Sequence, residues 1–286
     1  MARSGIGRRV REGLPLLPFL GYLFIFLVIP TITVVIGSVY LDGVFSLDRV
    51  RALGSSTALT ALWKSVLLSG STAVFGAVFG SVLAYLVVQS PPTSTLRRVV
   101  TSLCSVLAQF GGVMLAFAFL ATLGLSGVIT VWAEQQFGWD LAGSGWLYAL
   151  PGLVLVYTYF QIPLMVIVFL PALDGIRPQW REAAVNLGAS TWQYWTQVAV
   201  PLLRPAFLGS MLLLFANAFA AYATAAALVS QGSPVLPLLI RAALTSEVVL
   251  GQAGFAYALA LEMIVVVAIV MGSYALLVRR TTRWLQ

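Results

Sequence analysis

Residues Arg181–Ser190, REAAVNLGAS, form one of the few densely polar stretches in a chain that is 60% hydrophobic and 9% charged. A glutamate, an asparagine and a glycine stand together here between two long apolar runs. Pro178 indicates a helix start just before this stretch, because the first residue of a helix has no intrahelical hydrogen bond to lose. The sequence therefore predicts a helix that runs to Leu187 and ends at Gly188 in the left-handed conformation.

A second short helix is expected directly after this bend. Ser190 and Gln193 have the spacing of a capping box, in which each side chain bonds the backbone N–H of the other residue. We expect this helix to run to about Val198 and to stop at Val200-Pro201, because proline has no backbone N–H. Residues 172–203 thus form a helix-bend-helix. Its recurring apolar residues fit two alternatives. The loop either docks into a socket on another protein or lies in the membrane interface with its tryptophans at the level of the lipid headgroups.

The sequence on both sides of this loop is that of an integral membrane protein. Its mean hydropathy is +0.97, and six apolar segments are each long enough to cross a bilayer, which takes about 20 helical residues. The sequence predicts an all-α fold with six transmembrane helices in a single domain over residues 1–286. The predicted spans are 15–40, 63–88, 99–123, 146–171, 204–229 and 253–278.

Positive charges alternate between the two sides of the predicted spans. Twelve lie on the side of the 172–203 loop: Arg3, Arg8, Arg9, Arg11, Arg97, Arg98, Arg177, Arg181, Arg204, Arg279, Arg280 and Arg283. Four lie on the other side: Arg49, Arg51, Lys64 and Arg241. Because positive loops stay in the cytoplasm, both termini and the loop are predicted to be cytoplasmic. The orientation of the spans and the attraction to lipid headgroups then account for the net charge of +7, and no nucleic-acid partner is needed to explain it.

Several kinds of chemistry have little support in this sequence. The chain has no histidine and a single cysteine, Cys104, within an apolar run. A disulfide framework and a thiolate metal cluster are therefore excluded, and no metal site or catalytic residue is expected. No G-x-x-x-x-G-K-[ST] sequence occurs, so we expect the chain to bind no ATP of its own.

The loop resembles the "EAA" loop of binding-protein-dependent ABC importer permeases. That pattern reads E-A-A, three residues, G, nine residues, I-x-L-P, and Glu182-Ala183-Ala184, Gly188 and Val198-Ala199-Val200-Pro201 match its spacing. Valine replaces isoleucine at 198 and leucine at 200, and both exchanges are conservative. Gly188-Ala189-Ser190-Thr191-Trp192 is also similar to the usual continuation after the glycine. The run Tyr159–Met165 resembles the fourth-span region of the family, so the resemblance covers nearly the whole chain.

The resemblance implies a type I importer fold and a set of partners. Two cytoplasmic ATPase subunits would each grip an EAA loop and would bind the ATP and Mg²⁺. A second permease subunit, identical or homologous, would complete the translocation path, and an extracytoplasmic solute-binding protein would deliver the cargo. The location implied is the bacterial plasma membrane. The coupling-loop residues carried over are Glu182, Ala183, Ala184, Gly188, Trp192 and Pro201.

The cargo is expected to be a small charged solute. Within the family, the fourth and fifth spans look more like those of importers of polyamines, ferric iron, thiamine or aminoalkylphosphonates than like those of sugar importers. Glu262 is the only carboxylate at the expected middle of a span, and such buried groups are costly and often functional. Asn217, Tyr222 and Gln161 are further candidates to line the path. For all four the alternative is a structural hydrogen bond between helices or subunits.

Two other functions remain open at this stage. A sugar or glycerol-phosphate importer permease would carry the same loop. A secondary transporter or channel would also show six spans, but it is expected to show a second broken half related to the first and paired intramembrane charges. Neither feature is clear in the sequence.

Overall fold

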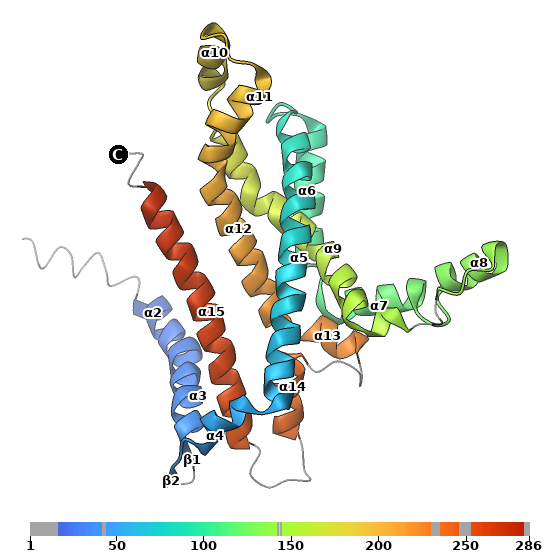
Figure 1. Cartoon of the computed structure of the whole chain (residues 1–286), viewed down its shortest axis with the longest axis vertical. Helices are drawn as coiled ribbons and strands as arrows, with labels where there is room; N and C mark the ends of the chain where they lie inside the picture. The colour runs from blue at the N-terminus through green and yellow to red at the C-terminus, as the bar shows by residue number, and fades with distance from the viewer. Residues whose placement is uncertain are drawn as a thin grey trace, which may run out of the picture. The chain divides into compact units, whose positions relative to one another are not determined.

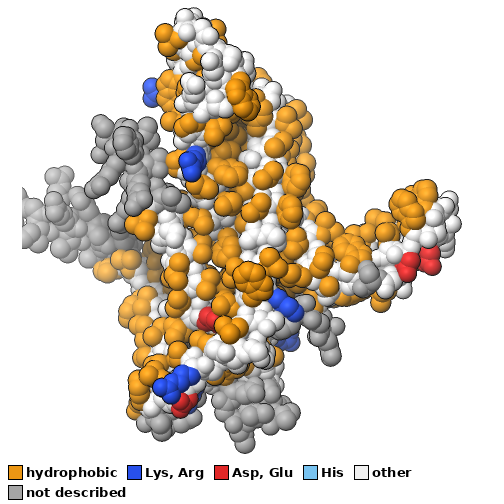
Figure 2. Space-filling model, in the orientation of Figure 1, with side chains coloured by type: hydrophobic (Ala, Val, Ile, Leu, Met, Phe, Trp, Pro, Cys, Tyr) orange, Lys and Arg blue, Asp and Glu red, His pale blue; other side chains and the backbone are white. Residues whose placement is uncertain are grey.

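The computed structural model describes residues 17–41, 44–141, 143, 145–229, 235–245 and 253–282. The predicted all-α class is confirmed, and the described residues contain six helical segments that are long and apolar enough to cross a membrane. Strand structure in the described residues is limited to one antiparallel pair, β1 (Tyr40–Leu41) with β2 (Val44–Phe45). Hydrophobic side chains cover most of the visible face in Figure 2, as expected of a surface whose solvent is lipid.

The chain divides into two units, of which the first comprises residues 1–58 and 240–264. Its N-terminal apolar segment is α2 (Leu17–Leu23), the π-helical turn η2 (Phe24–Val28) and α3 (Ile29–Val39). The large apolar side chains of this segment are mostly exposed, and only Gly37 and Ser38 are buried. After the strand pair come α4 (Asp48–Arg51) and the 3-10 turn η3 (Ala52–Gly54). The unit also includes parts of α14 (Leu236–Thr245) and α15 (Ala253–Thr282).

The second unit, residues 59–239 and 265–286, holds most of the remaining helices. In chain order these are α5 (Ser56–Val88), α6 (Thr95–Gln109), α7 (Gly112–Leu123), α8 (Val128–Phe137), the 3-10 turn η4 (Trp146–Tyr148), α9 (Leu150–Asp174), α10 (Pro178–Asn186), α11 (Thr191–Tyr194), the π-helical turn η5 (Trp195–Ala199), α12 (Val200–Ala220) and α13 (Ala223–Leu228). Figure 1 shows α5 and α6 side by side, α9 crossing them obliquely towards α12, and α10 and α11 beyond the end of α12.

Small residues allow α5 to approach α9 closely. A Cβ atom added at Gly76 would lie 2.7 Å from Cβ of Gln161, and one added at Gly80 would lie 2.5 Å from Cβ of Met165. Without a hydrophobic drive between helices in lipid, such close backbone contact is a main source of helix association. The buried residues Ala77, Met165 and Leu214 continue this contact to α12. The second unit is therefore built around α9.

Two of the predicted spans are interrupted in the structure. The predicted third span, 99–123, is divided into α6 and α7 at Phe110 and Gly111, and Gly112 follows with a φ of +74°. The predicted fifth span, 204–229, is divided into α12 and α13 at Ala221 and Tyr222. The two breaks meet, because the backbone N–H of Gly112 donates a hydrogen bond of 2.8 Å to Oγ1 of Thr224. This contact supplies a partner for a backbone group that the end of the helix leaves unsatisfied.

The predicted end of the second loop helix is also corrected by the structure. Helix α11 continues through η5 directly into α12, so Val200-Pro201 begins the next helix and does not stop the previous one. In a π-helical turn the hydrogen bonds join residues five apart. Pro201, which has no N–H to donate, lies in the first turn of α12, where the α-helical bonding pattern resumes.

Candidate functional site: the helix-bend-helix loop

The loop between α9 and α12 is shaped by local sequence rules. Arg177 is extended at the N-cap of α10, with φ −75° and ψ 132°, and Pro178 occupies the first turn as predicted. Gly188 has a φ of +79°, a conformation that a side chain with a Cβ disfavours. The N–H of Gly188 bonds the carbonyl of Val185, and the N–H of Ala189 bonds that of Ala184, both at 2.9 Å. This pair of bonds is a Schellman motif, which ends the helix in one defined direction.

The capping box on the far side of the bend is present as predicted. The N–H of Gln193 donates to Oγ of Ser190 at 3.2 Å, and the N–H of Ser190 donates to Oε1 of Gln193 at 2.7 Å. One residue, Ala189, separates this cap from Gly188. Each side of the bend is thus held by its own hydrogen bonds, so the loop has one preferred shape.

The bend presents an apolar tip. The side chains of Leu187 and Trp192 are 87% and 77% exposed, and Val185 is also largely exposed. Among the predicted loop residues, Glu182, Ala183 and Gly188 are exposed and Ala184 is half-buried. Pro201 is exposed in the first turn of α12 and therefore does not share the tip. Large apolar side chains concentrated on a loop are typical of a contact surface for another molecule.

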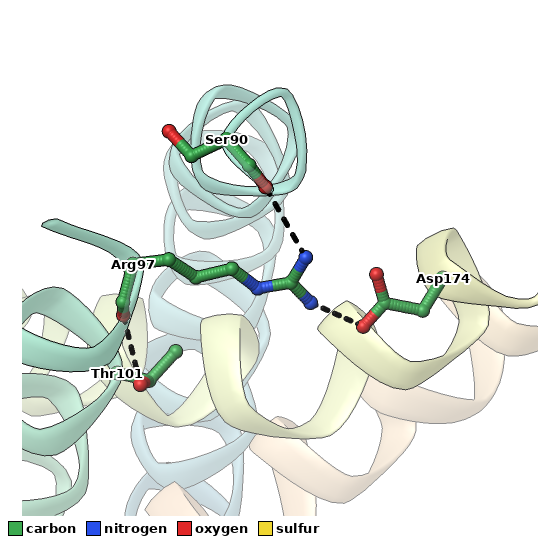
Figure 3. A network of polar contacts seen from close by, with 4 residues as sticks. All are labelled: Ser90, Arg97, Thr101 and Asp174. Carbon is green, nitrogen blue, oxygen red and sulfur yellow. Dashed lines mark hydrogen bonds and ion pairs between the residues drawn. The ribbon is translucent and has the colours of Figure 1, made fainter. Parts of the chain in front are cut away.

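A partly exposed ion pair joins the start of the loop to α6 and, through Arg97, to the turn after α5 (Figure 3). The guanidinium of Arg97, at the start of α6, pairs with the carboxylate of Asp174, the last residue of α9. The other terminal nitrogen of Arg97 donates to the carbonyl of Ser90, which follows α5, at 3.5 Å. Thr101 bonds the carbonyl of Arg97 at 2.9 Å. From the sequence, Arg97 was assigned only a topological role. This contact was not predicted, although an arginine and an aspartate at span ends facing the same side were an available signal.

An aromatic contact holds the other end of the loop. The rings of Tyr85 on α5 and Trp195 in η5 meet edge to face, with centroids 5.2 Å apart and an interplanar angle of 83°. Such pairs contribute about 0.5–1.5 kcal/mol beyond the area they bury. The start of the loop is therefore attached to α6 through Arg97, and its end is attached to α5 through Tyr85.

The structure brings two of the predicted path residues together. Nε2 of Gln161 donates to the carbonyl of Leu214 at 2.7 Å, and Nδ2 of Asn217 donates to Oε1 of Gln161 at 3.4 Å. Gln161 is completely buried, which favours the structural alternative for this residue, a polar link between α9 and α12. Asn217 is exposed on α12, so one side of this link lies on the surface of the chain.

The other two path candidates lie elsewhere. Tyr222 is half-buried at the break between α12 and α13, where its carbonyl accepts the N–H of Ala226 at 2.9 Å. Glu262 belongs to the first unit, on α15. Its Oε2 atom is buried, and within the described residues it has no hydrogen-bond partner. A buried carboxylate oxygen without a donor is costly, so this atom is the most unusual feature of the four candidates.

Residues 6–283 match the family described as "Binding-protein-dependent transport system inner membrane component". The chain belongs to this family. The resemblance to ABC importer permeases that the EAA loop predicted is thereby confirmed, and the chain is a multi-pass membrane protein.

Relatives of this inner-membrane component include permeases named for different cargoes. The ferric transport system permease protein FbpB of Actinobacillus pleuropneumoniae is 28% identical over 207 residues, which are 72% of this chain and 29% of FbpB. The sulfate transport system permease protein CysW of Synechocystis is 25% identical over 78% of each chain. The molybdenum transport system permease protein ModB of Escherichia coli is 30% identical over 59% of this chain and 72% of ModB. The chain spans about three-tenths of the length of the ferric permeases it matches.

Solved structures share the fold of this family member. A chain of the bacterial alginate ABC transporter, solved in complex with an alginate pentasaccharide-bound periplasmic protein, superposes with a TM-score of 0.74 at 20% identity over 98% of both chains. A chain of the MetNI methionine ABC transporter in an inward-facing conformation gives 0.57 at 15% identity, over 78% of this chain. At these identities the likeness concerns the fold alone.

Proposed function

We propose that the chain is the membrane-spanning permease subunit of an ATP-driven solute importer. It forms part of the translocation path and passes motion from a separate ATPase to its own helices. The observation that carries this proposal is the loop itself. A stiff helix-bend-helix with an exposed apolar tip lies between two membrane helices, in a chain of the importer family.

The proposal assigns ATP hydrolysis to partner subunits. Two ATPases would each receive one loop, with Leu187 and Trp192 entering a socket, and would hold the ATP and Mg²⁺. A second permease and an extracytoplasmic solute-binding protein complete the assembly. The chain's own role is non-catalytic. It supplies the path and the rigid connection to the ATPase.

The attachments of the loop suggest how motion reaches the path. When the ATPases approach each other, a loop seated in a socket moves with them as a rigid body. Asp174 is held by Arg97, and Trp195 packs on Tyr85. Displacement of the loop is therefore transmitted to α9, α12 and α5 together. Access to the cargo site would change from one side of the membrane to the other through this movement.

The proposed orientation places the loop and both termini in the cytoplasm of a bacterial cell. Arg177 and Arg181 lie on the loop, and Arg97, Arg98 and Arg204 lie near the adjoining helix ends, as the positive-inside rule requires of a cytoplasmic side. The N-terminal arginines and Arg283 lie outside the described residues.

For the cargo we propose a small charged solute, such as a polyamine or a solute of similar size. The buried carboxylate oxygen of Glu262, which has no partner among the described residues, supports a positively charged group, because a buried carboxylate is tolerated best when a cation visits it. Three relatives carry ferric, sulfate and molybdenum in their names, which are small charged solutes of either sign. A sugar or glycerol-phosphate cargo is the alternative within the family.

The deciding experiment is to purify the tagged full-length chain from its native membrane and to identify the subunits that copurify. We expect an ABC ATPase and a second permease, and ATP hydrolysis that rises when the cognate binding protein and its solute are added to reconstituted vesicles. Uptake driven by an ion gradient without ATP would instead establish a secondary transporter or channel. The solute found in the purified binding protein would identify the cargo.

A further inference from the structure

A groove of about 570 Å³ opens on the second unit beside the junction of the loop with α12. Its walls come from α5, α9 and the η5–α12 segment. The lining residues are Ser81, Val82, Tyr85, Phe169, Leu173, Trp195, Val200, Leu203, Arg204 and Phe207. The groove is thus apolar except for one serine, one tyrosine hydroxyl and one arginine.

Arg204 gives the groove a charged rim. Its side chain is exposed, and within the described residues its guanidinium forms no hydrogen bond or ion pair. Tyr85 and Trp195, the aromatic pair of the loop attachment, line the same groove. Tyrosine and tryptophan favour the level of lipid headgroups, where one end of the side chain is apolar and the other is wet. An arginine and two such aromatics at the end of an apolar groove match an amphipathic ligand with a negative head.

We propose that the groove is a binding site for an anionic phospholipid of the leaflet on the side of the loop. An acyl chain lies against Val82, Phe169 and Phe207, and the phosphate is held by Arg204. An arginine fork matches phosphate oxygens in geometry as well as charge. The proposal goes beyond the transport function, since it needs only that the helices are in a membrane.

Charge favours a lipid over an apolar helix from a second copy as the occupant. The exposed side chain of Arg204 lines a groove whose other walls are mainly apolar, and it has no partner among the described residues. A phospholipid supplies an acyl chain for the apolar walls and phosphate oxygens for the guanidinium. An apolar membrane helix laid over the groove would leave that charge covered and unpaired, which is costly.

The site lies where the loop passes into the membrane helices. Trp195 is the first residue of the π-helical turn η5, and Val200 is the first residue of α12. Such π-helical turns are frequent at functional sites. A lipid bound here contacts both the end of the loop and the end of α9 at Leu173. It therefore completes the packing of the joint through which the loop is attached.

The test measures lipid retained by the full-length chain, purified in detergent together with the subunits that copurify with it. Equal amounts of phosphatidylglycerol and phosphatidylcholine are added, and the bound lipid is counted by native mass spectrometry. We expect retention of phosphatidylglycerol over phosphatidylcholine by about fivefold, the effect of one basic residue near an anionic surface. Arg204→Gln should bind both lipids equally. Arg98→Gln, which removes an exposed arginine outside the groove, should keep the preference.

Two further variants separate the possible occupants. Ser81→Leu, which fills the groove, should reduce the retention of both lipids. Val82→Cys in a Cys104→Ser background reports on a second copy, because a disulfide between copies at this position would show that protein and not lipid covers the groove. Three outcomes would each overturn the proposal. The first is that disulfide, and the second is equal retention of the two lipids by the wild-type chain. The third is a preference for phosphatidylglycerol that Arg204→Gln leaves unchanged. None of these outcomes depends on transport, so failure of the lipid site is distinguishable from failure of the importer function.

Discussion

Arg97 and Asp174, 77 residues apart in the sequence, form an ion pair at the point where α9 becomes the loop (Figure 3). The Arg97 side chain is 10% exposed and that of Asp174 is 41% exposed. Water therefore reaches the carboxylate but hardly reaches the guanidinium. Removing the aspartate leaves a nearly buried cation whose one remaining partner among the described residues is the carbonyl of Ser90, and this asymmetry decides what each substitution does.

Asp174→Ala is expected to destabilise the chain and to weaken coupling. A donor left without its partner costs about 1–3 kcal/mol, which corresponds to a fall in apparent melting temperature of roughly 2–10 °C for a protein of this size. Size-exclusion chromatography after heating measures the first effect, and uptake per ATP hydrolysed measures the second. Arg97→Lys should retain part of the thermal stability and part of the coupling. Arg98→Gln should retain both at the wild-type level. A purely structural contact would lower the melting temperature but leave uptake per ATP unchanged.

Gly188→Val is expected to uncouple ATP hydrolysis from transport. Nothing lies within 4 Å of a Cβ placed at Gly188, so the cost comes from the left-handed backbone alone and is about 1–2 kcal/mol. Gly188→Asn is the matched control, because asparagine tolerates this conformation. The comparison is made with reconstituted complexes, by uptake and by stimulated ATP hydrolysis. Equal uptake by the valine and asparagine variants would show that the direction of the bend is unimportant.

The loop was largely predictable because each of its features depends on residues near in sequence. Pro178 in the first turn, the left-handed Gly188 and the box between Ser190 and Gln193 are local rules that neighbouring helices do not alter. Hydropathy located the apolar segments for the same reason. The expected stop at Pro201 was wrong, because η5 carries the helix past it.

Long-range bonds explain what the sequence did not reveal. The break before α7 is matched by Thr224, which bonds Gly112 across 112 residues, and an apolar run shows no sign of such a partner. Gln161 read as a path candidate because it is polar within a span. Its complete burial and its bond to the carbonyl of Leu214 depend on the packing of α9 against α12, which no local pattern encodes.

Glu182→Gln is expected to weaken the docking of the loop without altering its shape. Glu182 is exposed on α10, and its carboxylate forms no ion pair within the described residues, so its charge is available to a basic group on the ATPase. An exposed pair contributes about 0.2–1 kcal/mol, so we expect the affinity for the ATPase to fall by roughly 1.4- to fivefold. Pull-down titration at two salt concentrations measures this. Glu134→Gln, an exposed change on α8, serves as the control. If wild type and variant bind the ATPase with equal affinity at low salt, Glu182 does not contribute to docking and serves only to stabilise its helix.

Glu262→Gln separates the two interpretations of the buried carboxylate on α15. Glutamine keeps the size and one carbonyl oxygen but removes the charge. If Glu262 meets a charged cargo, uptake should fall by about tenfold, a loss of roughly 1.4 kcal/mol of interaction, while assembly and basal ATP hydrolysis stay near wild type. If the carboxylate serves only helix packing, all three quantities should hold or fall together.

The buried Oε2 atom without a partner in the described residues favours the first outcome. A purely structural carboxylate is expected to have both oxygens bonded, because an unsatisfied buried oxygen costs free energy that packing must offset. Glu262→Asp refines the test, since it keeps the charge but withdraws it by one methylene. Uptake that survives in the aspartate variant and fails in the glutamine variant would assign the effect to charge. The reverse order would assign it to side-chain length, and Glu262 would then be a packing residue that the cargo does not contact.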